Sequence, residues 1–271
     1  MTSPSKPRTP ALYHAGDAAP ATLPPSAAIA ISAGAVGTFY LGAGLLAGLI
    51  ALWWALVLGQ LLVGASALGT AWLFAGAGPR GALRVLGLRW PRALHVLAGA
   101  LLGASLWYVG LRIVDLVPWG DRAVERGRAL TSIVQELPLG SALVVLALLP
   151  GVCEELIFRG VLARGLASRW HPALAVGLSA LLFSGYHLSA VQAIPTLLLG
   201  LALGTLALRT RSLVPGMLAH VLNNASVIVV ARDDGAGGSA QWLDGNAAVA
   251  LAGALVLAGT GLALLKVVRP A

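Results

Sequence analysis

The sequence predicts an all-α polytopic membrane protein with about eight transmembrane helices. First, 58% of its 271 residues are hydrophobic and only 10% are charged, with a mean hydropathy of +0.86, whereas soluble domains carry about 25% charged residues. Second, most of the chain falls into apolar runs near the roughly 20 residues that a helix needs to cross a bilayer. Third, arginines recur between these runs, as they do in the cytoplasmic loops of inserted proteins.

Two regions follow from this pattern. Residues 1–25 are rich in Pro, Ser and Ala and lack the short apolar core and cleavage site of a signal peptide, so we expect a disordered cytoplasmic tail. Residues 26–271 are expected to form one eight-helix transmembrane domain. The expected spans are Ala27–Ile50, Ala55–Ala75, Ala93–Val117, Leu139–Leu162, Pro172–Leu188, Val191–Leu208, Leu213–Ala231 and Asn246–Val268.

Three local features accompany the early spans. Gln60 lies near the boundary between the first two. Gly44 and Gly48 form a GxxxG pattern, which can bring helices into close contact. In the third span, Arg112 and Asp115 stand at i,i+3 and are expected to form an ion pair near its outer end.

The distribution of basic residues predicts that both termini are cytoplasmic. With the N-terminus inside, the inner segments hold twelve Lys and Arg residues and the outer segments hold four, as positive-inside orientation requires. The inner set is Lys6, Arg8, Arg80, Arg84, Arg89, Arg92, Arg164, Arg169, Arg209, Arg211, Lys266 and Arg269, and the outer set is Arg122, Arg126, Arg128 and Arg232. Because the basic residues are spread between spans, we expect membrane lipid and no nucleic acid as a partner. A bias toward Ala, Gly, Leu and Arg is typical of GC-rich bacterial genomes and predicts the bacterial inner membrane.

The fourth span carries ionisable residues at membrane depth, which is a functional-site hypothesis by default because such residues are costly there. Glu154 and Glu155 are adjacent and Arg159 follows. Glu155 and Arg159 stand at i,i+4 and share a helix face, whereas Glu154 points roughly 100° away. One carboxylate is therefore expected to be neutralised by the arginine while the other faces elsewhere.

Two further polar pairs stand in later spans. Phe183 and His187 are i,i+4 in the fifth span, and His220 and Asn224 are i,i+4 in the seventh. Taken singly, each fits an ordinary hydrogen bond between helices, but together the three pairs predict one polar cavity formed by helices 4, 5 and 7. At 1.5 Å per residue, Glu154, His220 and Asn224 are expected about 12–18 Å from the cytoplasmic helix ends, and His187 deeper, at about 22 Å.

Three short patterns thus occur in order: EExxxR (Glu154, Glu155, Arg159), FxxxH (Phe183, His187) and HxxxN (His220, Asn224). Together they resemble the CPBP family of intramembrane glutamic endopeptidases, which includes type II CAAX prenyl proteases and bacteriocin-processing or immunity proteins. The resemblance covers about residues 139–230, which would form the protease-like core. It implies an endopeptidase that acts on a membrane-associated or lipidated peptide, without a cofactor or metal ion.

The residues themselves suit this chemistry, because amide hydrolysis needs an activated water and a stabilised oxyanion. We expect Glu154 to act as the general base and His187 to hold the same water or pass on its proton. His220 and Asn224 would donate hydrogen bonds to the oxyanion, and the resemblance implies the same roles. The expected catalytic residues are Glu154, His187, His220 and Asn224, and the supporting residues are Glu155, Arg159 and Phe183.

Other readings stay open at this point. Two histidines and a glutamate are a known zinc set, although the chain has no HExxH motif. Cys153, the single cysteine, is a poor nucleophile candidate because apolar surroundings do not activate a thiol. A non-catalytic bacteriocin-immunity or membrane scaffold protein could keep the same polar cavity for binding. A transporter is a third class, but no internal repeat suggests one.

Overall fold

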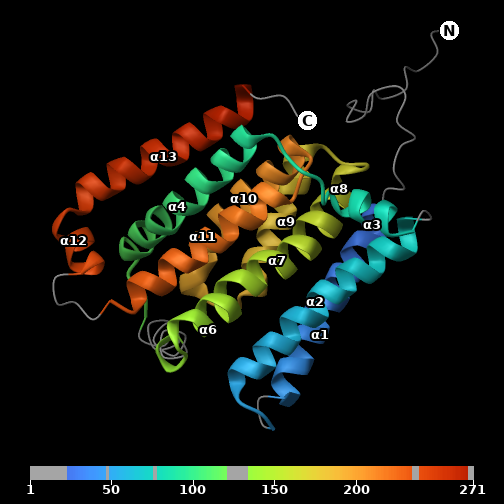
Figure 1. The fold of residues 1–271 in the computed structure, drawn as a ribbon, viewed down its shortest axis with the longest axis horizontal. Helices are drawn as coiled ribbons and strands as arrows, with labels where there is room; N and C mark the ends of the chain where they lie inside the picture. Colours follow the sequence, from blue (N-terminus) through green and yellow to red (C-terminus); the bar gives the residue numbers. More distant parts are fainter. Residues whose placement is uncertain (1–22, 47–48, 76–77, 121–133, 234–237, 268–271) are drawn as a thin grey trace.

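A computed structural model gives the arrangement of the chain (Figure 1) and describes residues 23–46, 49–75, 78–120, 134–233 and 238–267. Across those ranges the regular structure is entirely helical, which confirms the all-α class. The helices are α1 Pro25–Leu46, α2 Leu52–Ala75, α3 Gly78–Leu86, α4 Ala93–Asp115, α6 Leu139–Leu143, α7 Leu149–Glu155, α8 Arg164–Ala167, α9 Pro172–Tyr186, α10 Ala190–Thr210, α11 Val214–Ala231, α12 Ser239–Gly245 and α13 Ala247–Val267, with π-helical turns η1 Val144–Leu148 and η2 Leu156–Ala163.

The length and hydropathy of these helices fit a polytopic membrane protein. Within the described residues, seven helical stretches are long and apolar enough to cross a membrane, with α6 to α8 forming one continuous stretch, Leu139–Ala167. The fifth predicted span, α9, has only 15 residues. Its length of about 22 Å is less than the roughly 30 Å hydrocarbon core. The chain is thus an integral membrane protein, and the count of eight depends on α9.

Three features of the N-terminal half can be compared with the sequence predictions: the tail, the segment after the second span, and an ion pair in the third. Most of the predicted tail lies outside the described residues, and α1 already begins at Pro25. The segment between the second and third spans contains a short amphipathic helix, α3, which buries Ala82, Val85 and Leu86. The ion pair predicted between Arg112 and Asp115 is present, with 3.0 Å between Nη1 and Oδ2.

Helix α4 lies at the centre of one half of the bundle, packed against α10, α11 and α13, while α1 and α2 pack on the other side against α7 and η2 (Figure 1). Backbone contact between α4 and α11 depends on Gly99 and Gly103. A Cβ atom at either position would lie 2.3 Å from a carbonyl oxygen of α11, that of Pro215 or Ala219. Glycine is required at such a close approach.

The GxxxG pattern singled out in the first span does not do this. A Cβ added at Gly44 would meet no atom within 4 Å, and Gly48 lies outside the described residues. The same short pattern, at Gly99 and Gly103, provides the close contact in α4 instead.

The span that carries the glutamates is widened twice, at η1 and η2, on either side of α7. Pro150 has no N–H, so the carbonyl of Leu146, four residues earlier, lacks its usual helical donor. The Asn224 amide of α11 donates to that carbonyl at 3.2 Å. In η2, Ser179 of α9 donates to the carbonyl of Phe158 at 2.8 Å. Side chains of neighbouring helices thus donate hydrogen bonds to a backbone carbonyl in each of the two widened turns.

A tight turn joins α9 to α10. His187 is the first residue past the end of α9, and Leu188 adopts a left-handed conformation with φ 47°. Ser189 then caps α10 and accepts a hydrogen bond from the backbone N–H of Gln192. His187 therefore lies in the turn between the two helices, just past the last residue of α9.

Basic residues from three of the predicted inner segments meet at one end of the bundle. Arg89 donates to the carbonyls of Arg211 and Thr210, at 3.0 and 3.3 Å. Arg164 donates to the carbonyl of Val85 at 3.2 Å. These contacts place the segments around α3, α8 and the end of α10 on one side, as the predicted orientation requires, but the orientation itself stays a prediction. Lys6, Arg8, Arg122, Arg126, Arg128 and Arg269 lie outside the described residues.

Candidate active site

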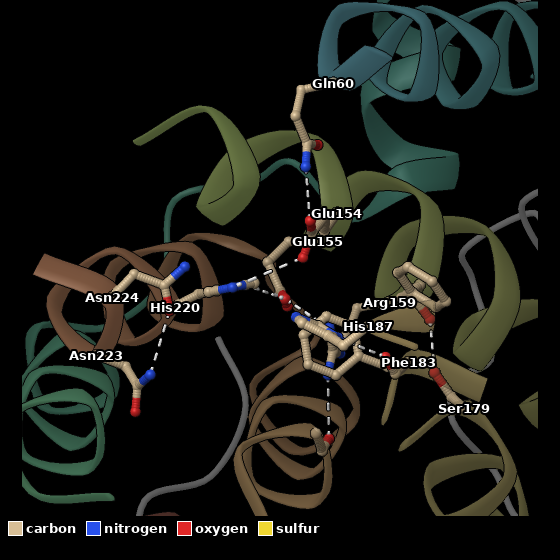
Figure 2. Close-up of polar contacts among 12 residues, drawn as sticks. Gln60, Glu154, Glu155, Arg159, Ser179, Phe183, His187, His220, Asn223 and Asn224 are labelled. Atoms are coloured by element: carbon tan, nitrogen blue, oxygen red, sulfur yellow. Dashed lines mark hydrogen bonds and ion pairs between the residues drawn. The ribbon is translucent and has the colours of Figure 1, made fainter. Parts of the chain in front are cut away.

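The three predicted polar pairs converge in the interior of the bundle (Figure 2). Glu154 and Glu155 end α7, Arg159 lies in η2, and His220 lies in the middle of α11. The exposed fraction of these four residues is 3%, 0%, 0% and 1%, respectively. Charged groups this deeply buried need partners, because an unpaired ion in a low-dielectric interior is strongly destabilising.

Glu155 is the centre of one hydrogen-bonded group. Its Oε1 atom lies 2.7 Å from Nη1 of Arg159 and 3.0 Å from Nδ1 of His220. Because a carboxylate oxygen only accepts, the shared contact places a hydrogen on Nδ1 of His220. The intrahelical pair expected from the i,i+4 spacing therefore forms, and it also fixes the imidazole of another helix.

Aromatic and backbone groups complete the surroundings of Arg159. Its guanidinium carbon lies 4.2 Å from the centroid of the Phe183 ring, and its Nη2 donates to the carbonyl of Gly200 at 3.3 Å. Phe183 also contacts both histidine rings, with centroids 4.9 Å from His187 and 5.6 Å from His220. One phenyl ring thus separates and orients three of the polar side chains.

Glu154 faces away from the arginine pair, as its position on the helix predicts. Its Oε1 accepts a hydrogen bond from Nε2 of Gln60, on α2, at 2.7 Å. Its Oε2 is buried and, within the part of the chain that is described, has no hydrogen-bond partner. The nearest nitrogen of His220, Nε2, lies 3.8 Å away, beyond direct hydrogen-bond distance.

The two glutamates, the arginine and a neutral His220 would together carry a net charge of −1. His220 lies between the two carboxylates, with its Nδ1 3.0 Å from Oε1 of Glu155 and its Nε2 3.8 Å from Oε2 of Glu154.

His187 is half-buried and lies beside the ring of Phe183. Its Nδ1 lies 2.9 Å from the carbonyl of Phe183. Because the carbonyl can only accept, Nδ1 carries the hydrogen, and Nε2 of a neutral ring is left as the basic nitrogen. His187 follows the last residue of α9 and lies close to Phe183 and, through that ring, to His220, while its expected depth stays a prediction.

Asn224 lies one helical turn beyond His220 on α11. One N–H of its amide donates to Leu146, and its Oδ1 accepts from Nδ2 of Asn223 at 3.2 Å. An amide nitrogen has two donors, so one N–H of Asn224 remains for another acceptor. Figure 2 shows Asn224 next to His220, whereas Asn223 extends away from the glutamates.

Two glycines make room for this arrangement. A Cβ atom at Gly216 would lie 3.2 Å from Oε2 of Glu155, and one at Gly151 would lie 2.5 Å from the side chain of Val221. Val221 is the neighbour of His220, so the second contact sets how closely α7 approaches α11. Both glycines therefore act on the distance between the glutamates and His220.

Part of the donor set is already engaged: Glu155 by Arg159, and the Nδ1 atom of His220 by the same carboxylate. Among the residues that the structure describes, no three His, Cys, Asp or Glu side chains are arranged to hold a metal ion.

Gln60 is the site residue that sequence reasoning missed, since it was noted only as lying near a span boundary. A signal was present: Gln60 is a polar residue inside an apolar run, the same observation that singles out Glu154. No pattern within α2 indicates which helix it faces, so its partner could not be named from the sequence.

Comparison with known proteins identifies the segment that carries the site. Residues 137–226 match the model of the family described as Type II CAAX prenyl endopeptidase Rce1-like. The match includes every residue of the three motifs and does not include α1 to α4. Searches of curated proteins and of solved structures found no match. This segment, which carries all three motifs, is thus similar to the Rce1-like family of type II CAAX prenyl endopeptidases.

Proposed function

We propose that this protein is an intramembrane endopeptidase in which Glu154 activates a water molecule. The observation that carries the proposal is the asymmetry of the Glu154 carboxylate. Its Oε1 is held by Gln60, while its buried Oε2 faces Nε2 of His220 without a hydrogen bond. A general base needs a fixed orientation and one oxygen available to the reacting proton, and Glu154 has both.

In the proposed reaction, Oε2 of Glu154 takes a proton from water as the water oxygen attacks the peptide carbonyl carbon. The carbonyl oxygen becomes an oxyanion, which accepts hydrogen bonds from the protonated Nε2 of His220 and from the second N–H of Asn224. Collapse of this intermediate breaks the C–N bond, and the proton on Glu154 passes to the leaving amine. The products are a carboxylic acid and an amine, the acid proton passes to the amine as they leave to give a carboxylate and an ammonium group, and Glu154 is ionised again.

The remaining residues support these steps. Glu155 holds His220 through Nδ1 and is itself neutralised by Arg159, so the imidazole is both oriented and stabilised as a cation. His187 presents its basic Nε2 and can accept a hydrogen bond from the same water. Burial of the set keeps bulk water out, which strengthens each electrostatic interaction with the oxyanion.

The substrate class follows from the family and the membrane location. The family description is that of prenyl endopeptidases, and the site is buried among membrane helices. We propose a membrane-associated or lipidated peptide as the substrate. We also propose that the protein lies in a bacterial inner membrane with both termini in the cytoplasm.

The decisive test compares Glu154→Gln with the wild type. Purified protein is incubated with a library of lipidated and unmodified peptides, and cleavage is followed by mass spectrometry. Glutamine keeps the size and polarity of the side chain but cannot take a proton, so turnover should be lost while the melting temperature changes little. Glu136→Gln, an exposed glutamate outside the site, is the matched control and should cleave normally.

Two outcomes would redirect the assignment. Cleavage by Glu154→Gln at the wild-type rate would show that glutamate chemistry is wrong. Survival of a cellular role such as toxin immunity in that variant would instead favour a non-catalytic binding or scaffold protein.

A further inference from the structure

We propose that Gln60 is a positioning residue for Glu154, supplied by α2 from outside the family segment. The inference rests on the proposed function, because it concerns how the general base is oriented and kept ionised. Gln60 lies in the middle of α2 with an exposed fraction of 5%, and its Nε2 donates to Oε1 of Glu154 at 2.7 Å. The match to the family begins at residue 137 and leaves this helix out.

The contact is well suited to hold a base. A hydrogen bond between a buried amide and a carboxylate is stronger than one between neutral groups. By occupying Oε1, the Gln60 amide leaves Oε2 as the reacting oxygen, on the side that faces His220. The same donor gives the ionised carboxylate a charge-assisted hydrogen bond that an apolar residue at position 60 could not supply.

Packing holds α2 in the position that this contact needs. A Cβ atom at Gly64, one turn after Gln60, would lie 3.0 Å from Sγ of Cys153, the residue before Glu154. The two helices therefore approach closely at the level of the glutamate. A glutamine at position 60 then spans the gap to the carboxylate without displacing either backbone.

Tyr186 provides a second layer behind this contact. The Oε1 atom of Gln60 and the hydroxyl of Tyr186 are both buried, and the Tyr186 side chain lies close to Gln60. Tyr40 of α1 donates a hydrogen bond to the backbone carbonyl of Tyr186. The α1–α2 hairpin therefore makes two contacts with the site region. Gln60 of α2 bonds to Glu154, and Tyr40 of α1 bonds to the end of α9 at Tyr186.

Other titratable or charged groups also lie near Glu154. They are His220 of α11, Tyr186 and His187 at the end of α9, Tyr40 of α1, Arg159 of η2, and the chain neighbours Cys153 and Glu155. These groups are unchanged in variants of position 60, so a difference between such variants reports on the Gln60 contact.

The experiment uses full-length protein in two variants, Gln60→Met and Gln60→Glu. Methionine keeps the length of the side chain and removes the donor, whereas glutamate places a second carboxylate beside Glu154. Thr70→Val is the matched control: Thr70 is a buried polar residue of α2 that hydrogen-bonds only within its helix, to Ser66, among the described contacts. Glu154→Gln is included to identify the Glu154 signal.

Two quantities are measured in each variant: the pH dependence of kcat/KM on a cleaved peptide, and the midpoint of the carboxyl titration by difference infrared spectroscopy, identified as the signal lost in Glu154→Gln. For Gln60→Met we expect kcat to fall about 10- to 100-fold with little change in KM, as for loss of a hydrogen bond to a charged group. The acidic limb and the infrared midpoint should both move upward, because the ionised carboxylate loses a hydrogen-bond donor.

The order of midpoints distinguishes positioning from mere packing. Wild type and Thr70→Val should have the lowest value, Gln60→Met a higher one, and Gln60→Glu the highest, because a neighbouring carboxylate disfavours ionisation. A folded Gln60→Met variant with the wild-type midpoint and kcat would overturn the proposal. So would a loss of kcat that follows only a lower melting temperature, with the midpoint unmoved.

Failure of the proposed function is separable from failure of this inference. If Glu154→Gln remains active, the peptidase mechanism is wrong, yet the infrared midpoints still test whether Gln60 holds the carboxylate. If Glu154→Gln is inactive while the midpoint is the same in all position-60 variants, only the role of Gln60 is rejected.

Discussion

The side-chain amide of Asn224 donates a hydrogen bond to the backbone carbonyl of Leu146, which Pro150 leaves without its usual helical donor. Pro150 cannot supply an N–H to the carbonyl of Leu146, and the Asn224 amide donates to that oxygen from the neighbouring helix at 3.2 Å. A residue expected to serve the oxyanion thus also joins α11 to the span that carries the glutamates.

This relationship predicts that the two roles of Asn224 can be separated. Asn224→Ala should lower the rate about 10²–10³-fold, as for loss of an oxyanion donor, and should destabilise the protein by about 1–3 kcal/mol by leaving a buried carbonyl unpaired. Adding Pro150→Ala supplies a backbone N–H, so the double variant should regain melting temperature but not rate. Recovery of both together would contradict a catalytic role for the amide. Melting curves and single-turnover cleavage measure the two effects.

The buried ion pair predicts a different pattern for Glu155. Glu155→Gln leaves Arg159 without its counter-ion at membrane depth, which should cost about 3–5 kcal/mol in stability as well as rate. Combining it with Arg159→Met removes the unpaired charge, so most of the melting temperature should return. The rate should stay low, because His220 loses the carboxylate that orients it. A double variant as unstable as Glu155→Gln alone would argue against the pair as the cause.

The proposed mechanism requires no metal ion. Peptide cleavage should therefore persist after prolonged chelation, and elemental analysis of purified protein should find no stoichiometric zinc. Thermolysin-like enzymes, which use a His–His–Glu zinc site, are the appropriate positive control for the chelator. Activity that is lost on chelation and restored by zinc would move the assignment to a metallopeptidase.

Orientation can be tested with single cysteines in a Cys153→Ala background. Arg209→Cys and Trp90→Cys should be shielded from an impermeant thiol reagent in intact cells, while Ser239→Cys should be labelled. The structure guides the choice of sites: Gly87 has a φ of 76° and Gly238 packs against Asp233, so cysteine would be strained at both, whereas Trp90 is 83% exposed. The reverse labelling pattern would reject the cytoplasmic placement of both termini.

The sequence predicts the partner of a polar side chain when both residues lie in one helix, but not when they lie in two different helices. Spacing alone places Arg159 on the face of Glu155, because both follow the same helical period. The partner of Glu154 could not be found in this way, since Gln60 precedes it by more than ninety residues and meets it only through packing of α2 on α7. Family resemblance did not help either, because it covers only the later helices.

Helix ends and close contacts show the same limit. Hydropathy extends the fifth span to Leu188, yet the helix ends at Tyr186, and this small difference decides where His187 lies. GxxxG occurs at Gly44–Gly48, in α4 and in α10, and composition does not distinguish Gly44 from Gly99 and Gly103, although of these three glycines only the two in α4 lie against the backbone of another helix. Whether a GxxxG pattern makes a close contact depends on which helix surface lies opposite it, and only the tertiary arrangement shows that.

The contact of Gly103 with Ala219 means that α4 sets the distance between α11 and its neighbours at the level of His220. Ala219 directly precedes His220, so the thickness of a single residue on α4 sets how far the imidazole projects toward the glutamates. No atom of Gly103 need touch a substrate for this to matter. A methyl group there would act as a spacer, widening the 3.8 Å separation between Nε2 of His220 and Oε2 of Glu154. The geometry of the candidate site thus depends on α4, a helix that supplies none of the proposed catalytic residues.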